Sequence, residues 1–184
     1  MHTANNTGVA IKSGRTLDSL LPQIGAVYIG IDPGQKGALG FILDKNVTVF
    51  DMPLLPDKQM DAWMIGTIIS SFIEQFGINQ ETYTVTCCLE KAQAMPKQGV
   101  TSVFNYGTGY GKIKAMLEWF KIPYEEIRPA KWKKEFSLDR DKAKSVALAK
   151  KLFPTQELVT KRGRLLDGRA EALLMAEYAR RRMS

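Results

Sequence analysis

A strictly alternating segment, followed at once by a tight turn and a second apolar segment, constrains the fold of this chain more than any other feature. Every second residue between Ala26 and Asp32 is Val or Ile, which is the period of a β-strand. The tripeptide that begins at Asp32 is Asp-Pro-Gly, which predicts a turn, and the apolar segment 38–43 predicts a second strand. The chain is therefore expected to open with antiparallel strands.

Further strands and helices follow in alternation. Strands are predicted at 47–51, 82–90 and 124–127, and helices at 59–76, 102–120, 139–152 and 166–182, with a helical turn around Trp132. The order β-β-β-α-β-α-β-α-α predicts one α/β domain over residues 26–184. Residues 1–25 are polar and lack periodicity, so they are interpreted as a flexible N-terminal extension.

Composition excludes several classes of protein. With 184 residues, 45% of them apolar, the chain can bury a sizeable core. No apolar run approaches the roughly 20 residues that a membrane-spanning helix needs. The two cysteines, Cys87 and Cys88, are neighbours, so they are interpreted as buried thiols in a reducing compartment rather than as a disulfide. A single histidine, His2, excludes a Cys/His metal cluster.

The positive charge is concentrated in the last third of the chain. The net charge is +7, with 9 basic and 10 acidic residues in 1–120 but 17 basic and 9 acidic residues in 121–184. A localised basic surface on a soluble domain most often faces phosphate, so nucleic acid is the first partner to consider. An anionic membrane surface and solubility alone are the alternatives.

Four carboxylates stand at the ends of predicted elements: Asp32 closes the first strand, Glu90 closes the clearest strand, and Asp167 and Glu171 open the last helix. The spacing of four places Asp167 and Glu171 on one helical face, where like charges repel. A divalent cation would remove that repulsion, and oxygen-only ligands suit Mg²⁺ or Mn²⁺.

Each carboxylate also has an ordinary structural explanation. Asp-Pro-Gly is a common turn, a glutamate at a strand end is usually solvated, Asp167 is suited to cap its helix, and Glu171 is suited to pair with a nearby arginine. One at a time the four acids are weak signals. Their combination with the flanking residues is what points to a site.

That combination resembles the RuvC-type Holliday-junction resolvases of the RNase H-like superfamily. The matching motifs are Ile29-Gly-Ile-Asp32-Pro-Gly with Gly37, Leu89-Glu90 before a loop with Gln98-Gly99, and Asp167-Gly-Arg-Ala-Glu171-Ala-Leu-Leu-Met-Ala. The family most often places two Asp three apart. Here the second acid is Glu and the spacing is four, which looks closer to phage RuvC-like proteins and plant chloroplast resolvases. The resemblance covers Val27 to about Arg180.

The resemblance implies an RNase H-like fold, a five-stranded mixed sheet whose first three strands are antiparallel, with helices on both faces. It also implies two-metal hydrolysis of a DNA phosphodiester by Mg²⁺ or Mn²⁺. Asp32 is then expected to bridge the two ions, Glu90 and Asp167 to hold one each, and Glu171 to lie on the side of the nucleophile. No small-molecule cofactor is implied. The expected location is the cytoplasm, with an organellar matrix as the alternative.

The expected substrate is branched DNA, with the four-way junction as the best case. Such a junction has two-fold symmetry and needs two symmetric nicks, so a homodimer is predicted. The helix 102–120 is the predicted dimer surface.

Lysines of the basic third are the candidate phosphate contacts. Relatives carry a lysine near the scissile phosphate, in a segment like Lys142-x-x-Ser145, so Lys142 is the preferred catalytic lysine and Lys133 its rival. Four lysines are expected to contact DNA phosphates: Lys131, Lys133, Lys134 and Lys144. For any single lysine, a solvated helix face is the alternative.

The segment after Glu90 interleaves aromatic, basic and small residues. Lys97 and Gln98 are expected to contact DNA, and Phe104, Tyr106 or Tyr110 to stack on an unpaired base at a junction centre. Core packing is the alternative for Phe104, because an apolar helix begins there.

Two other functional classes share some of these features. An actin-like ATPase also opens with a strand that ends in Asp-x-Gly, but it is expected to need a second lobe for which 184 residues leave no room. A non-catalytic DNA-binding module needs only the basic third, and the four acids argue against it.

Overall fold

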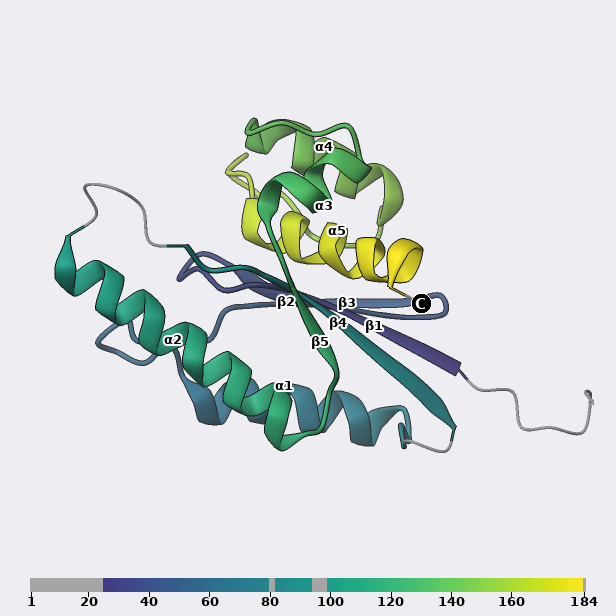
Figure 1. Ribbon diagram of the computed structural model, residues 1–184. Helices are drawn as coiled ribbons and strands as arrows, with labels where there is room; N and C mark the ends of the chain where they lie inside the picture. The colour runs from purple at the N-terminus through teal and green to yellow at the C-terminus, as the bar shows by residue number, and fades with distance from the viewer. Residues whose placement is uncertain (1–24, 80–81, 94–98, 184) are drawn as a thin grey trace, which may run out of the picture.

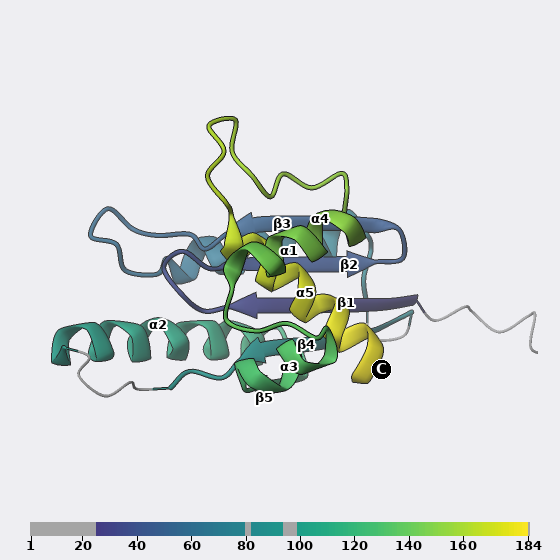
Figure 2. The same cartoon turned by 90° about the horizontal axis from the view of Figure 1, so that it is seen from above.

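Five strands form one mixed sheet, in the order β3-β2-β1-β4-β5 (Figure 2). The structure is a computed structural model that describes residues 25–79, 82–93 and 99–183. The strands are β1 (Gly25–Asp32), β2 (Ala38–Leu43), β3 (Asn46–Asp51), β4 (Tyr83–Glu90) and β5 (Tyr124–Ile127). β2 pairs antiparallel with β1 and β3, whereas β4 is parallel to β1 and β5. The predicted antiparallel opening is confirmed.

Helices cover both faces of the sheet (Figure 1). They are α1 (Ala62–Gln75), α2 (Val100–Trp119), α3 (Pro129–Glu135), α4 (Lys142–Leu152) and α5 (Asp167–Arg182). In Figure 1, α1 and α2 lie on one side of the sheet, and α5 lies on the other side with α3 and α4 above it. The predicted order of elements is therefore confirmed, with a short helix, α3, where a helical turn was expected.

Two helices begin three residues later than predicted, and capping is the reason. The Asp61 carboxylate accepts a hydrogen bond from the backbone N–H of Met64 (3.0 Å), so α1 begins at Ala62 rather than at residue 59. The Asp141 carboxylate accepts one from the N–H of Ala143 (2.9 Å), so α4 begins at Lys142 rather than at residue 139. Such side-chain caps satisfy backbone donors that the first turn leaves unpaired.

The core has two halves, one on each face of the sheet. Under α1, the Phe41 and Phe72 rings stack with their centroids 4.6 Å apart. Under α5, the core includes Trp132 and Leu173. The strand β4 contributes Cys87 to the first half and Cys88 to the second. Both thiols are free and fully buried, which confirms that part of their interpretation.

A pair of glycines allows α5 to lie close to the sheet. Gly30 of β1 and Gly40 of β2 are opposite each other in the pairing register. A Cβ atom on Gly30 would be 2.1 Å from the Ala172 carbonyl oxygen, and one on Gly40 would be 3.0 Å from the Ala172 carbonyl carbon. A side chain at either position would push α5 outward. The glycines therefore fix the height of α5 above the strands.

A third glycine fixes the start of α5. A Cβ atom on Gly168 would be 1.9 Å from the carbonyl oxygen of Lys36, in the turn after β1. Asp167, the residue before it, is consequently held next to the end of β1. This contact connects the two motifs that carry the predicted acids.

Within the described ranges, no helix is long and apolar enough to cross a membrane. Of the predicted extension 1–25, residues 1–24 lie outside the described residues, and Gly25 is the first residue of β1.

Candidate active site

The four predicted carboxylates gather at one end of the sheet. Asp32 and Glu90 are the last residues of β1 and β4, which are parallel neighbours with Ile31 opposite Leu89. Asp167 is the first residue of α5, and Glu171 follows one turn later. Burial is the largest cause of the raised pKa values of Asp32 and Glu90; the negative charges of Glu171 and Asp167 add to it at Asp32, and those of Asp32 and Glu171 add to it at Glu90. The acids are thus within electrostatic range of one another.

Asp32 is held by the turn that follows it. Its Oδ1 accepts a hydrogen bond from the backbone N–H of Gly34 (3.1 Å). Burial raises the pKa of Asp32 to about 6, with further contributions from the nearby acids, although the Gly34 N–H and Lys142 act in the opposite direction. The carboxylate is oriented by the backbone, and its negative charge is only partly balanced.

Glu90 is oriented by a tryptophan that the sequence reasoning did not assign to the site. The indole N–H of Trp132 donates to Glu90 Oε2 (2.8 Å), and Trp132 is fully buried. Burial raises the pKa of Glu90 to about 7 in spite of this hydrogen bond. A lone tryptophan in a short lysine-rich segment was the available signal, because a buried indole needs a partner for its N–H.

Glu171 lies in different surroundings, between two lysines. Its Oε1 is 2.7 Å from Lys133 Nζ, its Oε2 is 2.5 Å from Lys142 Nζ, and its side chain is only 4% exposed. Ser145 Oγ also donates to Glu171 Oε1 (3.3 Å). Lys142 Nζ is in addition 3.5 Å from Asp167 Oδ2. The predicted repulsion between Asp167 and Glu171 is therefore offset by lysines.

The donor chemistry of the site fits a hard divalent cation. Its candidate ligands are carboxylate oxygens, and two of the acids have raised pKa values because charge is crowded and buried there. In the arrangement described, no group of three or more His, Cys, Asp or Glu residues among the described residues is placed to hold a metal ion. Both oxygens of Glu171 are already occupied, because each accepts a hydrogen bond from a lysine ammonium group.

The predicted DNA-binding lysines divide into two groups. Lys131 and Lys134 of α3 are exposed, next to the paired Lys133. Lys144 is also exposed, but its Nζ is 2.5 Å from Asp139 Oδ2, so its charge is shared with a neighbouring acid. The predicted contacts Lys97 and Gln98 lie outside the described residues.

The three aromatic candidates on α2 have different positions. The Tyr110 hydroxyl donates a hydrogen bond to Glu126 Oε1 (2.6 Å). Phe104 is 72% exposed, so the core-packing alternative for it is wrong, because the first turns of α2 extend beyond the sheet (Figure 1). Tyr106 is half-buried; burial and the charges of Asp32 and Glu90 raise its pKa to about 12. Tyr106 therefore lies beside the acids, and Phe104 points to solvent.

Two grooves flank the turn after β1, and both include Gln35 and Lys36 in their lining. One, of about 660 Å³, leads to Tyr106 on α2. The other, of about 460 Å³, leads to Arg164 and Asp167. An apolar cavity of about 320 Å³ between the sheet and the ends of α1 and α2 is remote from the acids. The two grooves, rather than this cavity, therefore lead to Tyr106 and Asp167.

Comparison with known proteins finds likeness in structure only. No protein-family model matches the chain, and no curated protein matches it. A structure of Thermus thermophilus RuvC in complex with a Holliday-junction substrate superposes with a TM-score of 0.53 and 18% identity over 85% of this chain and 96% of that one. Another T. thermophilus RuvC structure gives 0.54 and 16% over 84% and 95%. The predicted RNase H-like fold is thereby confirmed.

Proposed function

We propose that this protein is a divalent-metal-dependent endonuclease that nicks branched DNA and resolves Holliday junctions. The observation that carries the proposal is the meeting of Asp32, Glu90, Asp167 and Glu171 at one end of a RuvC-like sheet. The T. thermophilus neighbour was solved with a Holliday-junction substrate, which supports the choice of substrate. A closer relation to phage and chloroplast resolvases stays a prediction from the Asp167–Glu171 spacing.

The strand half of the site, Asp32 and Glu90 at the ends of β1 and β4, is the better place for metal ions. These two acids would hold the ions together with Asp167 of α5 after their side chains shift into a ligand set that the described residues do not form. Bound Mg²⁺ or Mn²⁺ would polarise the phosphodiester and supply an activated water. Trp132 fixes the direction of the Glu90 carboxylate through its 2.8 Å hydrogen bond. The Gly34 N–H does the same for Asp32. Asp32 and Glu90 are thus pre-oriented, so their carboxylates need less reorganisation to reach the transition state.

Lys142 is better placed than Lys133 to touch a substrate. The Lys142 side chain is 49% exposed, whereas that of Lys133 is 13% exposed, although both contact Glu171. A DNA phosphate that enters the site can reach the Lys142 ammonium without rearrangement of the core. We therefore assign Lys142 to the scissile phosphate, and Lys133 to holding Glu171 in place.

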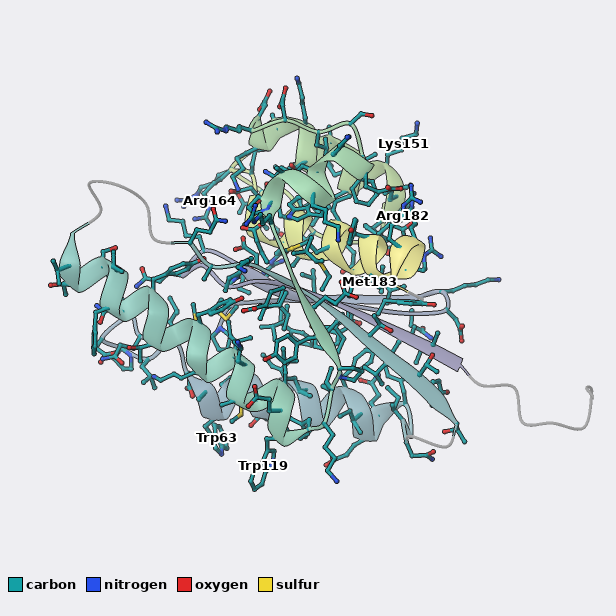
Figure 3. The ribbon with its side chains drawn as sticks, viewed as in Figure 1. Trp63, Trp119, Lys151, Arg164, Arg182 and Met183 are labelled. Carbon is teal, nitrogen blue, oxygen red and sulfur yellow. The ribbon has the colours of Figure 1, made fainter. Side chains whose placement is uncertain are left out.

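We also propose that the protein acts as a homodimer. A four-way junction has two equivalent strands to cut, and two copies related by a two-fold axis can cut both. Trp63 of α1 and Trp119 of α2 are exposed and extend from the same side of the molecule in Figure 3. They line one shallow groove together with Met116 and Phe120. Large exposed apolar patches of this kind are typical of protein interfaces, which supports α2 as part of the dimer surface.

A non-catalytic junction-binding module is the second candidate. It is favoured by one observation: the protein's own lysines already occupy both oxygens of Glu171. Such a protein would bind branched DNA through its basic surface and leave the strands intact.

Incubation with a synthetic four-way junction separates the two candidates. With Mg²⁺ or Mn²⁺, the nuclease should nick the junction at paired symmetric positions, which a sequencing gel maps. With a chelator it should make no nicks. A linear duplex of the same sequence serves as the control. Tight junction binding without nicks in either metal would contradict the nuclease and favour the binding module.

A further inference from the structure

A hairpin closed by backbone hydrogen bonds lies between α4 and α5, directly before Asp167. Val159 and Leu165 form an isolated antiparallel bridge. The N–H of Thr160 donates to the carbonyl of Arg164 (2.9 Å), and that of Gly163 donates to the carbonyl of Thr160 (2.9 Å). Gly163 has a φ of 81°, a left-handed conformation that favours glycine and closes a three-residue hairpin loop.

The base of the hairpin is fixed to the rest of the protein. Leu158 is 1% exposed within the core under α5, and its carbonyl accepts from the N–H of Leu166 (3.0 Å). Figure 2 shows the hairpin extending from the body of the protein on the side of β3. Its tip is therefore presented in a defined position, at the same end of the sheet as the acids.

The hairpin carries three exposed cations, Lys161, Arg162 and Arg164. Among the described residues, none of the three takes part in an ion pair, whereas Lys133, Lys142 and Lys144 all do. Arg164 adds, after Arg169, to the lowering of the pKa of Asp51, but no ion pair in the described part of the chain holds any of the three cations, so their charge is available to an external anion. A row of unpaired cations on a pre-ordered backbone is suited to phosphate groups, since little further ordering is needed on binding.

A groove connects the hairpin to Asp167. Arg164 and Asp167 lie along one part of its lining, and the exposed Lys36, from the turn after β1, lies along another. Lys36 and Gln35 also line the neighbouring groove that leads to Tyr106. An anionic strand that follows the two grooves in succession would pass Asp167 and the end of β1.

We propose that the hairpin 160–165, together with Lys36, binds the phosphate backbone of the cleaved DNA strand on one side of the reacting phosphate. This inference rests on the proposed function. Guanidinium and ammonium groups contact phosphate without reading sequence, so the hairpin sets the position of the strand in the site. The hairpin thereby determines which phosphate reaches Asp32 and Asp167.

The test compares two triple variants in an Asp32→Asn background with a chelator present, so that binding is measured without cleavage. The hairpin variant is Lys161→Gln, Arg162→Gln, Arg164→Gln. The control, Lys45→Gln, Lys150→Gln, Lys151→Gln, removes the same charge elsewhere. Lys45 lies in the β2–β3 turn, at the opposite end of the sheet from Asp32, and Figure 3 shows Lys151 far from Arg164. The measured quantity is the Kd for a four-way junction at several salt concentrations.

The hairpin variant should reduce the slope of log Kd against log salt by about 2 to 3, because each lost phosphate contact removes about 0.9. The control should reduce it by less than about 1. The single variant Arg162→Gln, at the exposed tip, should reduce the slope by about 1. It keeps the test valid if the triple variant does not fold. Equal slopes for the hairpin variant and the control would overturn the inference.

A second readout separates the hairpin from the nuclease itself. With Asp32 intact and Mg²⁺ present, the hairpin variant should nick at scattered phosphates, and the control should nick where the parent does. Unchanged nick positions in the hairpin variant would contradict the proposed role of the hairpin but not the proposed nuclease function. Failure of the parent to bind or nick a junction would overturn the proposed function and, with it, this inference.

Discussion

The two halves of the acidic site balance their charge in different ways. On the helix side, Glu171 is nearly fully buried but accepts hydrogen bonds from two lysines and a serine. On the strand side, Asp32 and Glu90 are oriented by single N–H donors and have raised pKa values of about 6 and about 7. Among the described residues, lysines form ion pairs with Glu171 and Asp167, whereas they act on Asp32 and Glu90 only at longer range. An added cation should therefore bind most favourably at the strand half, where it would balance the most negative charge.

This difference indicates that the two halves have different functions. A buried carboxylate with no cation partner costs stability, and proteins keep such groups where function needs them. A buried carboxylate that is paired with lysines is part of the framework that holds those lysines. The comparison therefore separates Asp32 and Glu90, which we propose as metal ligands, from Glu171, which we propose positions Lys142.

The largest expected effect is that of Asp32→Asn on cleavage. The change removes the central negative charge of the strand half but no phosphate contact. Cleavage of a four-way junction should fall by at least about a thousandfold, which is about 4 kcal/mol of transition-state stabilisation. Junction binding should stay within a few-fold. Asp44→Asn, in the turn between β2 and β3, is the matched control. A rate above about a tenth of the parent rate would remove Asp32 from the mechanism.

The next largest effect compares the two glutamates by stability. Glu171→Gln leaves the mostly buried Lys133 without its anionic partner and leaves Lys142 with Asp167 alone, so it should lower the free energy of unfolding by about 2 to 4 kcal/mol. Glu90→Gln should be neutral or stabilising at pH 8, because an amide keeps the Trp132 hydrogen bond and removes a buried charge. Urea unfolding without divalent cations measures both. The same sign for both variants would show that the two halves are alike.

Local patterns were sufficient to predict much of this arrangement. The alternation before Asp32 and before Glu90 indicated two strands that each end in an acid. The structure adds that the two strands are parallel neighbours, which places both acids at the same edge of the sheet. The four-residue spacing of Asp167 and Glu171 correctly indicated one helical face. Each of these signals is contained in a few consecutive residues.

The parts that could not be predicted depend on contacts between distant segments. Trp132 and Glu90 are 42 residues apart, and Lys133 and Glu171 are 38 apart. The repulsion predicted within α5 treated the helix in isolation and missed the lysines of α3 and α4. Likewise, an apolar start to α2 suggested that Phe104 is buried, but the helix extends beyond the sheet at that point.

The pH dependence of stability should report on the strand half. The folded-state pKa values of Asp32 and Glu90 lie above the ordinary values of 3.8 and 4.5, so folding favours their protonated forms. Without divalent cations, stability should therefore fall as the pH rises from about 4 to 7. Mg²⁺ or Mn²⁺ should raise the Tm by several degrees at pH 8 and by much less at pH 5.

Thermal melts at several pH values, with and without metal, measure this effect. The double variant Asp32→Asn, Glu90→Gln is the control, and both its pH slope and its metal response should be largely lost. A metal response that is the same at pH 5 and pH 8, or that persists in the double variant, would place the cation away from the strand half.

The smallest expected effect separates the two lysines that share Glu171. Lys142 is half-exposed beside Asp167, so Lys142→Ala should slow cleavage by about tenfold to a hundredfold, which is about 1.4 to 2.7 kcal/mol, with little change in junction binding. Lys133 is mostly buried, so Lys133→Ala should act mainly by lowering the Tm. Lys144→Ala, on the same helix as Lys142 but paired with Asp139, is the control and should change neither quantity appreciably. If Lys133→Ala slows cleavage at an unchanged Tm while Lys142→Ala does not, the roles of the two lysines are reversed. The helix half would then touch the substrate through its buried lysine.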